Sequence, residues 1–288
     1  MLPFRRVLFP VDYSHNCEAT VPYVIDWADR FGASIKLVHA CGAILNIPYD
    51  LMVEAAVTWP EDVMDYEKDR LAEFAAKHFP GREVEMVVER GEAAAGIQEV
   101  ISRDGTDLIM MPTHGYGPVR KMLLGSTTAK LLHDVTTPLW TASYKVLDRE
   151  IPSIPVQSIV CAVDESEEHE AVAVAGDRIA HRLGAKLSLV RASFPVPGFP
   201  EVDATNYQRE LVAVSAMELG RVKEAHCGDS ATLTVAIAPV LYAVCDEVRR
   251  TKADLLIVGR GKSHDAFARA FSSLYPMIRD AGCPVLSI

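Results

Sequence analysis

The segment from 107 to 128 combines the residue types that proteins use to hold phosphate groups. An apolar run, DLIMMP, is followed by Gly115, and after nine intervening residues GSTT at 125–128 opens a stretch with helical spacing. Glycine lets backbone amides approach a ligand closely because it has no Cβ. The start of a helix adds unpaired N–H groups and the positive end of the helix dipole, which favour anions. The pattern predicts a phosphate site, with turn-forming glycines and a simple helix cap as the alternative.

Further candidate positions lie where other apolar runs end. Asp12 closes the run VLFPVD, Ala40 closes SIKLVHA, and Met111 stands near the end of DLIMMP. In open α/β sheets, ligands bind beyond the carboxyl ends of the strands, where the strand order reverses. We therefore expect these three residues to line one crevice together with the glycine-containing segment.

The elements that must position these residues occur twice. VLFPVD at 7–12 returns as IVCAVD at 159–164, and FGASIKLVHA at 31–40 returns as LGAKLSLVRA at 183–192. The spacing from the aspartate to the final alanine is 28 residues in both halves. A repeat of this length is far longer than a solenoid unit, so each copy should be a domain with its own core.

Each half is predicted to alternate strands and helices, because short apolar runs alternate with stretches of helical spacing. In the first half the strands are expected at 7–11, 34–40, 84–91, 107–112 and 138–143, with helices at 17–31, 61–79, 93–103 and about 126–134. In the second half the strands are expected near 158–163, 186–192, 231–238, 254–259 and 284–288.

Apolar strands of this kind, separated by helices, imply parallel sheets that are covered on both faces. The predicted fold class is α/β: two doubly wound, mainly parallel five-stranded sheets with helices on both faces, Rossmann-like and tandemly duplicated. The first domain is expected at 1–146, a short linker with two prolines at 147–155, and the second domain at 156–288.

Composition excludes several classes of protein. The chain has 288 residues, 49% of them hydrophobic and 24% charged, which is ordinary globular composition. A net charge of −10 argues against non-specific binding to nucleic acid or anionic membranes. No apolar run approaches the ~20 residues of a membrane span, and the N-terminus leads into a strand rather than a signal peptide, so we expect a cytoplasmic protein. The six cysteines contain no C-x-x-C pair and are expected to be reduced and mostly buried.

The glycine-containing segment resembles the signature of the universal stress protein family, G-x2-G-x9-G-(S/T), between an apolar strand and a short helix. PTHGYGPVRKMLLGST at 112–127 matches from Gly115 onward, and the runs VLFPVDYS and LVHA match the family's first two strand ends. The resemblance covers essentially the whole chain, twice, and implies a tandem protein with an adenine nucleotide alpha-hydrolase-like fold. Walker A and dinucleotide G-x-G-x-x-G motifs are absent, which argues against a P-loop enzyme or a nicotinamide dehydrogenase.

The resemblance implies that the first half binds ATP, AMP or a related adenine nucleotide, with or without bound Mg²⁺. Asp12 would meet the ribose or adenine, the Ala40 backbone would read the adenine edge, and Met111 would pack on the base. The full expected set is Pro10, Val11, Asp12, Ala40, Met111, Pro112, Gly115, Gly125, Ser126 and Thr127. Pro112 departs from the family because it replaces the first glycine of the signature, and proline has no N–H to donate. One hydrogen bond, worth about 0.5–1.5 kcal/mol, would be lost.

The second half keeps a weaker version of this set. Its members are Asp164, Ala192, Gly259, Gly261 and Ser272. The glycine pair is one residue shorter, and Phe271 replaces the helix-opening glycine, so we expect a filled or blocked site and a structural role. A small-anion site near Arg260, Lys262 and Arg269 is the alternative.

No catalytic residue and no metal site is predicted. No nucleophile is paired with a base and an orienting group, and the nine histidines form no H-x-x-x-H pair or Cys/His cluster. The resemblance implies a stress-response regulator or sensor that passes nucleotide occupancy to protein partners. Two alternatives stay open: a nucleotide-free adaptor, for which Pro112 and Phe271 argue, and a slow ATPase or nucleotide transferase.

The last strand of each half, PLWTAS and CPVLSI, lies at an expected sheet edge, and unpaired edges seek partners. In the family this strand commonly pairs two protomers, so a tandem chain can make the pairing internally as a pseudo-dimer. A homodimer through another face is a further expectation, with Trp59, Pro60 and the apolar stretch 43–57 as its candidate surface; a lid or a packed loop is the alternative there.

Overall fold

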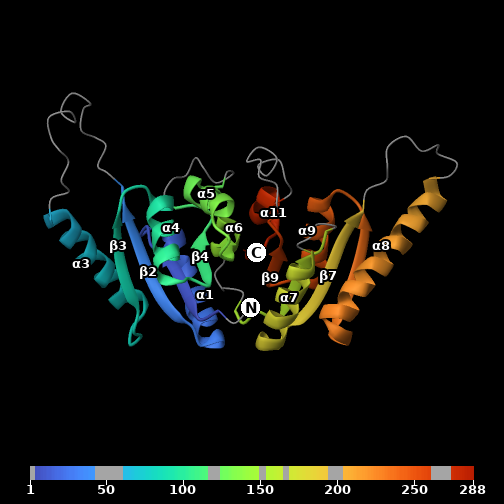
Figure 1. The fold of residues 1–288 in the computed structure, drawn as a ribbon, viewed down its shortest axis with the longest axis horizontal. Helices are drawn as coiled ribbons and strands as arrows, with labels where there is room; N and C mark the ends of the chain where they lie inside the picture. The colour runs from blue at the N-terminus through green and yellow to red at the C-terminus, as the bar shows by residue number, and fades with distance from the viewer. Residues whose placement is uncertain are drawn as a thin grey trace, which may run out of the picture.

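The computed structural model describes residues 4–42, 61–115, 124–148, 154–164, 169–193, 204–260 and 274–288. The first half contributes strands β1 (Arg6–Pro10), β2 (Ser34–Cys41), β3 (Glu85–Arg90), β4 (Leu108–Pro112) and β5 (Leu139–Ala142). The second half contributes β6 (Ser158–Ala162), β7 (Lys186–Ser193), β8 (Ala231–Ile237), β9 (Leu255–Val258) and β10 (Val285–Ser287). These strands form one sheet in the order β3-β2-β1-β4-β5-β10-β9-β6-β7-β8 (Figure 1).

Helices cover both faces of this sheet. They are α1 (His15–Phe31), α3 (Glu61–His78), α4 (Ala93–Asp104), α5 (Ser126–Asp134), α6 (Tyr144–Leu147), α7 (His169–Leu183), α8 (Ala204–His226), α9 (Val240–Thr251) and α11 (Leu274–Asp280). Helices α1, α3, α7 and α8 share one hydrophobic core, and α4, α5, α9 and α11 share the other. Successive strand residues point to opposite faces, so Phe9 lies in the first core and Leu8 in the second. Figure 1 shows α3 and α8 at the two far ends of the molecule.

The structure confirms the predicted strands of both halves and the predicted helices of the first half, with ends that differ by at most two residues. The two expected five-stranded sheets are joined into one, because β5 and β10 pair antiparallel, with Trp140 opposite Leu286. The internal pairing expected for the last strands is thereby confirmed, and all other neighbouring strands are parallel. Within each half the strand order reverses between the first and fourth strands, at β1/β4 and at β6/β9.

Arg260, just after β9, links the two halves beside this seam. Its guanidinium donates through Nη2 to the carbonyl of Thr137 at 2.6 Å and through Nη1 to the carbonyl of Val135. It also donates to Ser287 of its own half at 3.1 Å. The sequence suggested Arg260 as positive charge for a small anion, but in the structure backbone carbonyls engage this side chain.

A buried carboxylate stabilises the second half. Glu247 on α9 is 2% exposed and accepts hydrogen bonds from Ser188 Oγ at 2.5 Å and Arg250 Nη2 at 2.7 Å. Burial alone would raise the pKa of Glu247, but the hydrogen bonds from Arg250 and Ser188 outweigh it and hold the pKa below its ordinary value.

None of the six cysteines forms a disulfide and five of them are buried, as the sequence predicts. No helix in the described part of the chain combines the length and apolar character that a bilayer crossing requires. The candidate homodimer surface, 43–57 with Trp59 and Pro60, lies outside the described residues.

Candidate functional site

A crevice opens where β1 and β4 separate at their carboxyl ends. Val7 and Leu8 of β1 pair with Leu108 and Ile109 of β4. Further along, each strand keeps only its outer neighbour: Pro10 pairs with Val38 of β2, and Pro112 pairs with Ala142 of β5. This is the switch point in strand order, where open α/β sheets bind their ligands.

The structure brings all the residues expected from the sequence in the first half into this one crevice. They are Pro10, Val11, Asp12, Ala40, Met111, Pro112, Gly115, Gly125, Ser126 and Thr127. The sequence-based set missed further lining residues, namely Val38, His39, Ala93, Ile97, Thr113, His114 and Thr128. The helical spacing of α4 was visible in the sequence, but nothing local indicated that Ala93 and Ile97 on this helix would face the end of β2.

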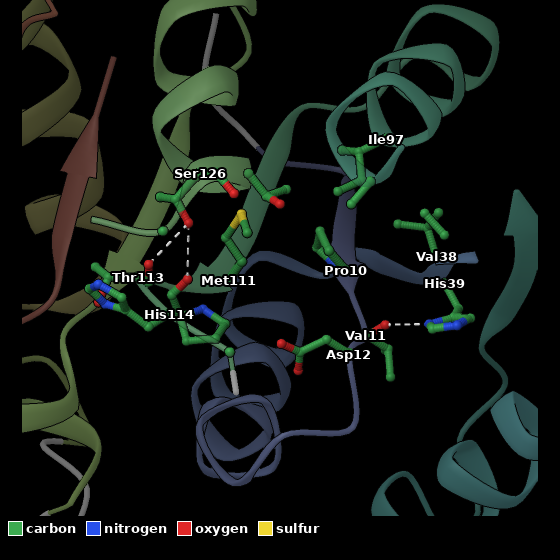
Figure 2. A pocket seen from close by; sticks show the side chains of 17 residues that line it. Pro10, Val11, Asp12, Val38, His39, Ile97, Met111, Thr113, His114 and Ser126 are labelled. Carbon is green, nitrogen blue, oxygen red and sulfur yellow. Dashed lines mark hydrogen bonds between the residues drawn. The ribbon is translucent and has the colours of Figure 1, made fainter. Parts of the chain in front are cut away.

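The crevice has an apolar end and a polar end. Figure 2 shows Val38, Ile97 and Pro10 gathered on one side, with Ser126 and Thr113 on the other. An apolar wall suits the face of a purine, and hydroxyl and amide donors suit phosphate oxygens. The spatial separation of the two ends matches a ligand with a flat apolar part and an anionic tail.

Two glycines approach their neighbours closely inside this crevice, and at Gly125 the neighbour is backbone. A Cβ on Gly115 would lie 1.9 Å from Oδ2 of Asp12, and a Cβ on Gly125 would lie 2.8 Å from the carbonyl oxygen of Thr113. Both distances are far below van der Waals contact, so a side chain at either position would displace its neighbour. The lack of a side chain at these two positions therefore allows the segment after β4 to lie close to Asp12 and to the start of α5.

The start of α5 offers donors from Ser126 and Thr127 rather than from every residue in the turn. The amide of Gly125 donates to the carbonyl of Thr113 at 2.9 Å, so it is already engaged within the protein. The hydroxyl of Thr128 is buried, within 3.3 Å of the carbonyl oxygen of Pro112. No described side chain caps α5, which leaves the first-turn amides to a ligand or to water.

Two prolines face each other across the crevice. Val11 donates its amide to Val38 of β2, and Thr113 donates its amide to Ala142 of β5. Because successive amides of a strand point to opposite neighbours, the nitrogens of Pro10 and Pro112 both point into the gap between β1 and β4. Neither position needs a ladder hydrogen bond there, which explains why proline is tolerated in central strands. The missing donor of Pro112 nevertheless lies on the crevice side.

Asp12 is presented by a tight turn between β1 and α1. Its Oδ1 accepts the amide of Ser14 at 2.9 Å, and Tyr13 between them has a left-handed φ of 61°. Ser14 then caps α1 by accepting the amide of Cys17 at 3.2 Å. These local bonds fix the aspartate backbone, and its exposed carboxylate lies at the mouth of the crevice beside Gly115.

Two histidines, His39 and His114, contribute to the lining of the crevice. The Nδ1 of His39 donates to the carbonyl of Val11 at 2.7 Å, as Figure 2 shows, and its Nε2 lies 3.4 Å from Oε2 of Glu67. The Nδ1 of His114 lies 3.0 Å from the hydroxyl of Thr113. Burial lowers the pKa of His114 below its ordinary value, so its ring is neutral at neutral pH.

The structure describes only part of the corresponding site in the second half. Ala192 lies on β7 and Gly259 follows β9, while Asp164 follows β6 and its carbonyl accepts Nη2 of Arg191 at 3.4 Å. Five residues singled out in the second half lie outside the described part of the chain, and these are Gly261, Lys262, Arg269, Phe271 and Ser272. Among the described residues, no group of three or more His, Cys, Asp or Glu is placed to hold a metal ion.

Comparison with known proteins places this architecture in a family. The sequence model of the universal stress protein family matches residues 3–142 and again residues 155–288. A universal stress protein of Mycolicibacterium smegmatis is 28% identical over 136 residues, which are 46% of this chain and 44% of that protein. The chain thus spans less than half of the length of that relative.

Solved structures show the same fold over nearly the whole chain. A universal stress protein from Archaeoglobus fulgidus is similar with a TM-score of 0.71 and 18% identity, covering 98% of this chain and 95% of that one. A protein of unknown function from Pseudomonas aeruginosa is similar with a TM-score of 0.64 and 13% identity, covering 99% and 92%. With two family matches that together span both halves, the chain belongs to the universal stress protein family and is a tandem member of it.

Proposed function

We propose that the first half binds ATP or a related adenine nucleotide and that the protein acts as a nucleotide-dependent stress-response regulator. The observation that supports this most directly is the convergence of ten residues, selected from sequence alone, on one crevice at the switch point of the sheet. Separation of an apolar wall from an uncapped helix start within that crevice supports the same ligand class.

The parts of such a ligand can be assigned to different residues. The base would lie against Met111, Ile97 and Val38, all of which line the apolar end. The exposed carboxylate of Asp12 would accept hydrogen bonds from ribose hydroxyls. The phosphates would meet the amides and hydroxyls of Ser126 and Thr127, where the helix dipole also favours negative charge.

The proposed role is binding rather than turnover. Catalysis of phosphoryl transfer by side chains needs a positioned base or a carboxylate set for a metal ion. Asp12 is the one carboxylate in the described lining. The Nδ1 of His114 lies 3.0 Å from the Thr113 hydroxyl, and its buried Nε2 has no hydrogen-bond partner among the described residues. A nucleotide-free adaptor is the competing function, and Pro112 supports it because the crevice lacks a donor on that side.

The first experiment is to denature freshly purified full-length protein and identify released nucleotide by chromatography and mass spectrometry. Isothermal titration with ATP, with and without Mg²⁺, follows on nucleotide-free protein. Asp12→Ala should weaken binding, and Asp164→Ala, its counterpart in the second half, should leave it unchanged. Gly125→Phe should abolish binding, because its side chain would begin 2.8 Å from the Thr113 carbonyl oxygen.

Each outcome decides between the functions. The proposal is supported if the wild-type chain releases about one adenine nucleotide and if Asp12→Ala loses this nucleotide while Asp164→Ala keeps it. No released nucleotide and no heat on titration would assign the protein to the adaptor class. Two nucleotides per chain would show that the second half also binds.

A further inference from the structure

A second cavity, unrelated to the crevice, lies in the other half between α7, α8 and the end of β7. Its volume is about 530 Å³, compared with about 200 Å³ for the crevice of the first half. Its lining contains two positively charged side chains, Arg191 and Arg221, and two negatively charged ones, Glu170 and Glu218, beside an apolar wall. It lies on the face of the sheet covered by α7 and α8, whereas the crevice is lined by α4 and α5.

Comparison of the halves explains why there is space here. Counted back from their ends, α3 and α8 align, because Leu71 and Leu219 are both buried and the ion pairs Glu18–His78 and Glu170–His226 recur. Three residues after the aligned leucines, α3 has Phe74 and α8 has Val222.

In the first half, aromatic rings fill the corresponding region. The Phe74 ring lies 5.8 Å from that of Tyr13 and 4.4 Å from that of His78, measured between centroids. The Tyr13 ring also carries the guanidinium of Arg70 at 3.9 Å. Val222 instead lines the second cavity. Loss of one large ring from this position is therefore part of what opens the cavity.

The cavity contains a buried guanidinium, that of Arg191, which is paired with the exposed carboxylate of Glu218. The Arg191 side chain is 7% exposed, and its Nη1 donates to Oε2 of Glu218 at 2.9 Å. The Glu218 side chain is 47% exposed, so its carboxylate can return to solvent when another carboxylate takes its place on Arg191. The counterpart positions in the first half differ in chemistry, because His39 stands at the strand position of Arg191 and Arg70 at the helix position of Glu218, and His39 lies 3.4 Å from Glu67 instead.

The remaining lining sets the character of a ligand. Leu211, Val214 and Val222 provide an apolar wall, and Val214 is 47% exposed at its edge. Exposed Arg221 adds a second guanidinium at the rim. Guanidinium groups recognise planar carboxylates by paired hydrogen bonds.

We propose that this cavity binds a small organic carboxylate with a compact apolar body, whose carboxylate replaces that of Glu218 on Arg191. The apolar body would cover Val214 and Val222, and Arg221 would close the site from the rim. The proposal is independent of nucleotide binding in the first half, because the two cavities share no lining residue.

The test uses full-length protein with ¹³C-labelled leucine and valine methyl groups, titrated with 4-methylpentanoate. The methyl signals of Leu211, Val214 and Val222 should shift in a saturable way, while those of Leu131 and Leu132 on α5 should not. 4-Methylpentanamide tests the need for the charge, and acetate tests the need for the apolar body. Both should bind at least roughly tenfold more weakly.

Three variants sharpen the test. Glu218→Gln should strengthen binding, because it removes the competing carboxylate, and a side chain that is 47% exposed can be changed without loss of the fold. Val222→Phe should abolish binding by restoring the ring that the first half has. Arg191→Lys should weaken binding roughly tenfold while it keeps the charge. Far-UV circular dichroism and thermal unfolding establish that each variant is folded.

Equal affinity for the carboxylate and its amide would overturn the proposal. Unchanged affinity in folded Glu218→Gln would do the same, because the ligand would then not compete for Arg191. Absence of saturable shifts in the wild-type chain up to the solubility of 4-methylpentanoate would also refute it.

Discussion

Replacement of Pro112 by glycine should tighten nucleotide binding. The nitrogen of Pro112 points into the gap between β1 and β4, so Pro112→Gly places a new N–H donor in the crevice. The backbone there is held from two sides, by strand pairing with Ala142 and by the Thr128 hydroxyl, 3.3 Å from the Pro112 carbonyl oxygen. The substitution should therefore add the donor without moving the strand.

The size of the effect follows from the value of one hydrogen bond. A net gain of about 0.5–1.5 kcal/mol corresponds to a Kd lower by about 2- to 12-fold. Glycine also makes the unfolded chain more flexible, which should cost about 0.5–1 kcal/mol of stability. This cost lowers the thermal midpoint but does not enter Kd as long as the protein stays folded.

Isothermal titration of nucleotide-free protein with ATP measures the change. Pro112→Ala supplies the same N–H and should show a gain of the same sign, whereas Pro80→Gly, at an exposed turn after α3, should show none. If both Pro112 variants bind ATP no better than the wild type, the amide does not face the ligand and the assignment of the crevice geometry is wrong.

Three further predictions concern stability and reactivity. Arg260→Ala should lower the free energy of unfolding by about 1.5–3 kcal/mol in urea denaturation, because backbone carbonyls lose a charged donor; Arg249→Ala, at a side chain 71% exposed, should change it by less than about 0.5 kcal/mol. The folded-state pKa of Glu247 is below its ordinary value of 4.5, so its contribution to stability is present above that pH and is lost as pH falls through the folded pKa. Glu247→Gln should therefore flatten the fall in stability on the acid side, and an unchanged acid limb would contradict this. Burial raises the pKa of Cys17 to about 12, so in native protein at pH 8 a disulfide reagent should modify the partly exposed Cys245 first and leave Cys17 unmodified until the protein unfolds.

The ends of the elements could be predicted because their signals are local. Asp12 closes an apolar run, and Gly125 opens a helix, so composition over a few residues is enough to place them. Their meeting in one crevice then follows from parallel α/β topology, in which the carboxyl ends of the strands lie at one edge. The same reasoning placed the last strand of each half at an edge that needs a partner.

The engagement of individual donors could not be predicted, because it depends on contacts between segments far apart in the chain. The Gly125 amide was expected to face phosphate, yet it donates to Thr113, since the segment after β4 folds back on α5. Arg260 was interpreted as charge beside a ligand loop, yet it bonds Thr137, 123 residues away. No local pattern encodes either contact.

The second cavity shows another limit of sequence comparison. The halves differ in the length between their second strand and the following helix, so Phe74 and Val222 become equivalent only when α3 and α8 are aligned from their ends. Val222 by itself is an ordinary helix residue. The space it leaves is visible only after the surrounding elements are in place.

The seam between β5 and β10 has a consequence for how the two halves can change. In a symmetric dimer each residue of the interface occurs on both sides, so any substitution is made twice. Here Trp140 faces Leu286 within one chain, and either can change alone. Covalent connection also keeps the halves at high effective concentration, so dilution does not separate them. After duplication, a substitution in one half is therefore not repeated in the other. A ligand site can be altered in one half while the other half keeps its own site.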